Sequence, residues 1–183
     1  MNTLNSILLL LATFLAVFWE GSFSGIRHLF GAQIDLLPAL VVYASLCSGL
    51  TTMTLVAVMG GLLLDTLSAN PAGITVLPLL VPGFVLHGQR DLVLRDQPFA
   101  QLVIGLAVSA TVPALTILLL LTCGHAPLLG WGSLWQWIVM TLGGGVATPV
   151  VFQLFDLSDR ALSYRRATET SFRPDRQIRR GRS

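Results

Sequence analysis

The sequence contains no lysine, and charged residues of any kind make up only 11% of its 183 residues. A soluble domain normally carries about a quarter charged residues. Because 54% of this chain is hydrophobic, it has too few charges to cover a soluble surface, and lipid is the expected solvent. Eight of the eleven arginines lie between Arg160 and Arg182, so the net charge of +2 comes from a basic tail.

Several kinds of functional site are also missing. The chain has no Gly-rich phosphate loop, no basic helix face and no Cys/His cluster, so we expect neither nucleic acid nor a metal as a ligand. It also has no nucleophile–base pair and no paired-carboxylate motif, and we expect a non-enzymatic protein without a cofactor. Cys47 falls near the inner end of the second predicted span and Cys123 near the outer end of the fifth, so the two lie at opposite sides of the bilayer. We therefore expect two buried thiols rather than a disulfide, whose Cα atoms lie within about 7 Å.

Six apolar runs indicate membrane-spanning helices, each of which needs roughly 20 residues to cross the hydrocarbon core. The first run lacks a basic n-region and a cleavage site, so we interpret it as a retained span. The second and fourth runs are short, and five spans with one re-entrant segment is the alternative. The runs are 4–19, 36–48, 50–67, 74–87, 99–123 and 134–157.

The arginines predict the orientation of these spans, because cytoplasmic loops carry an excess of basic residues. With the N-terminus inside, the cytoplasmic segments hold Arg90, Arg95 and the eight tail arginines, and the outside holds only Arg27. Tryptophan rings settle at the headgroup level, and in this arrangement all four tryptophans fall on the outer face. We predict an all-α bundle of six transmembrane helices over 1–158, followed by an Arg-rich cytoplasmic tail over 159–183. The tryptophans are Trp19, Trp131, Trp135 and Trp137.

Two aspartates near the outer face are the most informative polar residues. Asp65 ends an uncharged run and is interpreted either as a polar anchor inside the bundle or, preferably, as a residue that caps the turn at 68–73. Asp35 precedes Leu36, Leu37 and Pro38, which is an ordinary helix start with an Asp N-cap and an early proline. Both carboxylates could meet in one outer polar site.

The basic residues and the remaining connections have two interpretations each. Arg90 and Arg95 in the loop at 87–96, and Arg165 and Arg166 in the tail, could contact a cytoplasmic partner. The simpler interpretation is a solvated loop and a tail attracted to anionic lipid. The residues at 158–170 predict a helical extension, and the stretch at 21–34 is either a short interfacial helix or an irregular loop.

Two segments resemble a known family. Asp35-Leu-Leu-Pro38-Ala-Leu-Val-Val-Tyr43 resembles the start of the second helix of the MreD family, the rod shape-determining membrane proteins. The run from Gly61 through Asp65 to Pro71-Ala-Gly73 is similar to that family's pattern of glycine, aspartate and proline-x-glycine. The similarity extends over about 35–120. The turn at 47–49 lacks the expected basic residue, and the basic tail is longer than in the family.

The resemblance implies a non-enzymatic component of the bacterial cell-elongation machinery in the cytoplasmic (inner) membrane. Proteins of the MreD family bind the membrane-anchored protein MreC and are associated with MreB, RodA and a class B transpeptidase, which serve cell shape and lateral peptidoglycan synthesis. The family's fold is similar to the six-helix substrate-binding subunits of energy-coupling-factor vitamin transporters, and such a subunit is the alternative function.

A partner contact follows as a hypothesis from the small residues of the third span. Gly60 and Gly61 would let the single helix of an MreC-like partner approach closely, because helices associate in lipid through close packing. Asp35, Pro38 and Asp65 would set the depth and register of that contact, and Pro71 and Gly73 would shape the turn beside it.

Overall fold

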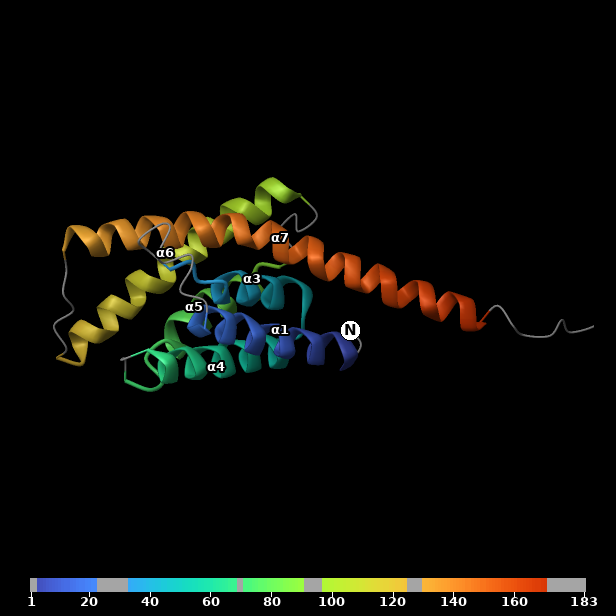
Figure 1. Cartoon of the computed structure of the whole chain (residues 1–183), viewed down its shortest axis with the longest axis horizontal. Coiled ribbons are helices and arrows are strands. Elements are labelled where there is room, and N and C mark those ends of the chain that lie inside the picture. Colours follow the sequence, from blue (N-terminus) through green and yellow to red (C-terminus); the bar gives the residue numbers. More distant parts are fainter. Residues whose placement is uncertain (1–2, 23–32, 69–70, 91–96, 125–129, 171–183) are drawn as a thin grey trace, which may run out of the picture. The chain divides into compact units, whose positions relative to one another are not determined.

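The computed structural model describes residues 3–22, 33–68, 71–90, 97–124 and 130–170, and the regular structure in these ranges is entirely helical (Figure 1). Each helix overlaps one of the six predicted apolar runs, and only the last is much longer than its run. The helices are α1 (Thr3–Ser22), α3 (Leu37–Cys47), α4 (Leu50–Leu67), α5 (Val76–Gly88), α6 (Pro98–Thr122) and α7 (Trp131–Thr170).

Four of the described helices are long and apolar enough to cross a membrane. The chain therefore has the build of a helical membrane protein, as its composition predicts. The other two helices, α3 and α5, are apolar but have only 11 and 13 residues. The four long candidate spans are Asn5–Ser22, Leu50–Leu67, Pro98–Thr122 and Trp131–Ser158.

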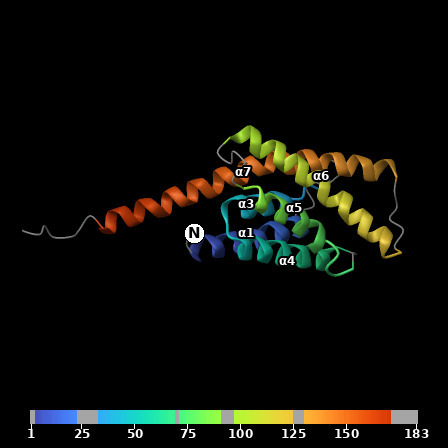
Figure 2. The same ribbon diagram turned by 180° about the vertical axis from the view of Figure 1, so that it is seen from behind.

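The chain divides into two compact units, Met1–Phe152 and Gln153–Ser183. In the first unit, α3 is the central helix and contacts α1, α4, α5 and α6. All residues from Leu37 to Leu46 are buried, which fits a helix that is apolar on every side. Successive helices of this unit run in alternating directions, and Figure 2 shows the same arrangement from behind.

Small residues bring the helices of the first unit close together. A Cβ atom added at Gly83 of α5 would lie 2.9 Å from the sulfur of Met53 in α4 and 3.2 Å from Val41 in α3. Gly105 of α6 faces Thr148 of α7 in the same way. The close approach is the packing that small residues give to membrane helices.

The second unit contains the remainder of α7, which continues to Thr170. The helical extension predicted at 158–170 is thus confirmed. The interfacial helix proposed for 21–34 falls mostly on 23–32, outside the described residues. The cysteine prediction was partly wrong, since Cys123 is exposed at the end of α6 and Cys47 is half-buried, although the two are not bridged.

Candidate functional site

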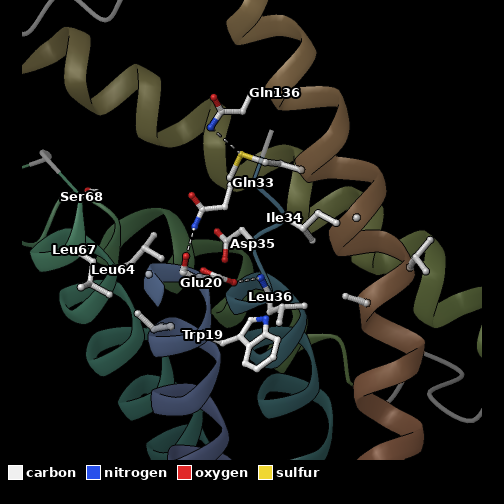
Figure 3. A pocket seen from close by; sticks show the side chains of 16 residues that line it. Trp19, Glu20, Gln33, Ile34, Asp35, Leu36, Leu64, Leu67, Ser68 and Gln136 are labelled. Carbon is white, nitrogen blue, oxygen red and sulfur yellow. Dashed lines mark hydrogen bonds between the residues drawn. The ribbon is translucent and has the colours of Figure 1, made fainter. Parts of the chain in front are cut away.

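A cavity of about 600 Å³ lies in the first unit, where α1 ends and α3 begins (Figure 3). It is bounded by α1, by the residues that precede α3, by the end of α4 and by the first half of α7. Among the residues that the structure describes, its lining is mostly apolar and contains no basic side chain. The lining residues are Val17, Trp19, Glu20, Gly21, Gln33, Ile34, Asp35, Leu36, Leu64, Leu67, Ser68, Gln136, Met140, Gly143, Val146 and Ala147.

The cavity exists because α3 is shorter than the helices around it. A Cβ atom added at Gly60 would meet the side chains of Leu37 and Thr13, so the first residue of α3 lies level with these points of α4 and α1. From that level α4 continues to Leu67 and α1 to Ser22. At 1.5 Å per residue, each extends about 10 Å or more beyond the start of α3, and α3 leaves this space unfilled.

Glu20, the acidic residue of α1, lines this cavity. Its Oε1 atom accepts a hydrogen bond of 2.5 Å from the Leu36 N–H, and its backbone carbonyl accepts one of 3.2 Å from the Gln33 side chain. Its Oε2 atom is buried and has no hydrogen-bond partner. The sequence interpretation did not single out Glu20. The available signal was a lone carboxylate at the end of an otherwise uncharged helix.

Asp35 lies beside Glu20 at the start of α3 and is 6% exposed (Figure 3). Its Oδ1 atom accepts a hydrogen bond of 2.8 Å from the Leu37 N–H. The N-cap itself is Leu36, one residue later than predicted, but Asp35 still pairs the first helical N–H and Pro38 lies in the first turn.

Together Glu20 and Asp35 place two carboxylates on the first two N–H groups at the start of α3. The N-terminus of a helix carries a partial positive charge that stabilises nearby anions. This partial charge stabilises one negative charge at the start of α3, and a second negative charge exceeds what it balances.

Asp65 is fully engaged in a separate network and does not line the cavity. It is 2% exposed. Its Oδ2 atom accepts hydrogen bonds from the N–H groups of Gly73 at 2.8 Å and Thr75 at 3.2 Å, and its Oδ1 atom accepts one from the Thr75 hydroxyl. Asp65 therefore closes the connection between α4 and α5, as the preferred interpretation predicts. It does not form a shared site with Asp35.

The glycine and proline of this connection have matching roles. Gly73 has a φ of +92°, a conformation that other residues rarely adopt. The carbonyl of Pro71 accepts a hydrogen bond from Ile74 at 3.3 Å, which closes the turn. Pro71 and Gly73 thus shape the turn that Asp65 holds.

Gly60 and Gly61 face the interior of the first unit. Both are buried. A Cβ atom at Gly60 would meet Leu37 and Thr13, and one at Gly61 would lie 3.0 Å from the Cα atom of Val76. These glycines serve contacts of α4 with α1, α3 and α5, so they do not form an open surface for a partner helix.

The four arginines proposed as cytoplasmic contacts are not gathered into one described site. Arg90 is exposed just after α5. Arg95 lies outside the described residues, and Arg165 and Arg166 lie in the part of α7 whose side chains are not described. Near Arg90, the His87 Nδ1 atom lies 3.0 Å from the carbonyl oxygen of Ser45, so His87 joins α5 to α3 rather than belonging to a solvated loop.

Within the described part of the chain, no three residues of the types His, Cys, Asp and Glu are grouped so as to hold a metal ion. Comparisons with protein-family models, with curated proteins and with solved structures find no match.

Proposed function

We propose that the chain is a non-enzymatic membrane scaffold of the bacterial cell-elongation (rod) complex. In this proposal it lies in the cytoplasmic membrane and binds the single transmembrane helix of an MreC-like protein. MreB, RodA and a class B transpeptidase would belong to the same assembly, so the chain would support cell shape and lateral peptidoglycan synthesis.

The observation that carries this proposal is the connection between α4 and α5. Of the two segments that resemble the MreD family, the second contributes Gly61, Asp65, Pro71 and Gly73, and these four form one connected structure. Gly61 packs on the start of α5, and Asp65 accepts the N–H of Gly73. A pattern whose members hold one another in place has a physical reason to occur together, which supports the resemblance.

The proposed topology has six passes with both ends in the cytoplasm. The alternating directions of the helices in the first unit support it (Figure 1). α3 and α5 have lengths of about 16 and 20 Å at 1.5 Å per residue, which is less than the roughly 30 Å of the hydrocarbon core. Their flanking residues would complete these two passes.

The partner helix would bind on an exposed face, since Gly60 and Gly61 are occupied internally. α1 carries such a face. Ile7, Leu11, Phe14 and Phe18 are spaced along one side of this helix and are each about half exposed, and the last two rings stack with centroids 6.4 Å apart. α6 and α7 also expose large apolar side chains. In lipid these faces are available for helix packing.

Co-purification tests the scaffold proposal. The tagged chain is co-expressed with the MreC-like protein of the same organism and purified in mild detergent. We expect a stoichiometric complex that survives size exclusion. An unrelated protein with a single transmembrane helix serves as the control and should not be retained. A monodisperse chain that retains neither protein would contradict the proposal.

The cavity favours a second candidate function, a substrate-binding subunit of an energy-coupling-factor-type vitamin transporter. Its volume of about 600 Å³ lies in the range of small-molecule sites. A transporter subunit would retain a coupling subunit rather than an MreC-like protein in the same purification, which separates the two candidates.

A further inference from the structure

We infer that the cavity at the start of α3 binds a small organic cation, an ammonium group carried on an apolar body. The inference does not rest on the scaffold proposal, because it concerns the cavity and not the exposed faces of the helices. It would hold equally for a scaffold with a bound ligand and for a transporter subunit.

The charge of the site is the first reason. Glu20 and Asp35 come from different elements and meet at one wall of the cavity (Figure 3). Each uses one carboxylate oxygen on an N–H group of α3, and the Oε2 atom of Glu20 is buried without a partner. A buried carboxylate oxygen without a hydrogen bond is unfavourable. The described part of the lining offers no basic side chain to compensate, so an ammonium group from a ligand fits this position.

The remainder of the lining fits the body of such a ligand. Val17, Leu64, Leu67 and Met140 provide apolar walls. Ligand sites are commonly apolar, with a small number of polar groups that fix orientation. Here those groups would be the carboxamides of Gln33 and Gln136 and the aromatic ring of Trp19, whose face can also attract a cation.

Other ligand classes fit less well. Calcium takes six to eight oxygen ligands and magnesium demands an octahedron of oxygens, and the lining is mostly apolar with two carboxylates. An anionic ligand would be repelled by Glu20 and Asp35. A neutral apolar ligand would leave the Oε2 atom of Glu20 without a partner.

Calorimetric titration of the full chain in a maltoside detergent free of amine lipids tests the inference. The probe is phenethylammonium, and its matched controls are neutral 2-phenylethanol and anionic phenylacetate. We expect saturable 1:1 binding of the ammonium alone. The control titrations share the apolar ring, so they isolate the contribution of the charge.

Variants locate the binding. Glu20→Gln keeps an oxygen for the Leu36 N–H but removes the charge, and we expect it to weaken binding by about tenfold or more. Asp156→Asn removes an exposed carboxylate of the second unit and should leave binding within about twofold of the wild type. Ala147→Phe fills the cavity from α7, keeps both carboxylates and should abolish binding. Asp35→Asn replaces the first variant if Glu20→Gln is not monodisperse.

Addition of phosphatidylethanolamine distinguishes a lipid headgroup from a free amine as the natural source of the ammonium. Competition with the probe identifies a headgroup, and no competition identifies a free amine. The inference is overturned if the wild type shows no saturable binding, if the alcohol binds as tightly as the ammonium, or if the Glu20 variant binds like the wild type. Capture of an MreC-like partner has no bearing on these outcomes.

Discussion

Replacement of Asp65 should loosen the connection between α4 and α5. In Asp65→Ala the N–H groups of Gly73 and Thr75 and the Thr75 hydroxyl lose their common acceptor. Thr75 is 3% exposed, whereas Gly73 is half-buried. A buried donor without a partner costs about 1–3 kcal/mol. Because water can reach Gly73 and the hydroxyl can turn to another acceptor, we expect a total loss of about 2–4 kcal/mol.

The conservative variant should lose less. In Asp65→Asn the amide oxygen can take the place of Oδ2 and keep both N–H bonds, and the Thr75 hydroxyl can accept from the amide nitrogen. Only the added strength of bonds to a charged acceptor is lost, about 1 kcal/mol. The order of stability should therefore be wild type, Asp65→Asn, Asp65→Ala.

Thermal unfolding in maltoside micelles, followed by circular dichroism, measures this order. For a chain of this size a change of 1 kcal/mol shifts Tm by about 2–4 °C, so Asp65→Ala should lower Tm by roughly 4–16 °C. Asp156→Ala, at an exposed position in the second unit, is the control and should change Tm by less than about 2 °C. An Asp65→Ala variant as stable as this control would refute the reasoning and would favour Asp65 as a partner-binding residue.

Two further predictions follow from the packing and from the topology. Gly105→Ala should destabilise the chain by about 1–2 kcal/mol in the same thermal assay, because the added Cβ atom would lie 2.7 Å from the Cβ atom of Thr148; the better helix propensity of alanine offsets part of this overpacking. Gly49→Ala is the control and should be neutral, because a Cβ atom at Gly49 would meet nothing within 4 Å. Equal effects of the two substitutions would contradict the packing. In Cys47→Ala the exposed Cys123 is the sole thiol, and a membrane-impermeant maleimide should label it in intact cells; labelling only after permeabilisation would reverse the proposed orientation.

The positions of the helices follow from the sequence because uninterrupted apolar runs report directly on helices in lipid. The run at 50–67 coincides with α4 at both ends, where Gly49 precedes it and the turn held by Asp65 follows. The role of Asp65 was predictable because its partners Gly73 and Thr75 lie within ten residues of it in the sequence.

The inward direction of Gly60 and the cavity were not predictable in this way. In a soluble helix the polar face marks the outside, but α4 is apolar on its exposed face too, as Leu55, Met59 and Leu62 show. The pattern therefore cannot say which side Gly60 occupies. The cavity depends on the level at which α3 begins relative to α1 and α4. Glu20 and Asp35 lie on different elements, and no local sequence pattern predicts that their side chains meet.

Photo-crosslinking in membranes of cells that co-express the MreC-like protein tests the scaffold most directly. A photoreactive amino acid is placed at exposed positions of three helices, Leu11 of α1, Val103 of α6 and Leu142 of α7, and at Val56, which is fully buried. The proposal predicts a crosslink to the partner's transmembrane helix from at least one exposed position and none from Val56. No crosslink from any exposed position, with both proteins present in the membrane, would contradict it.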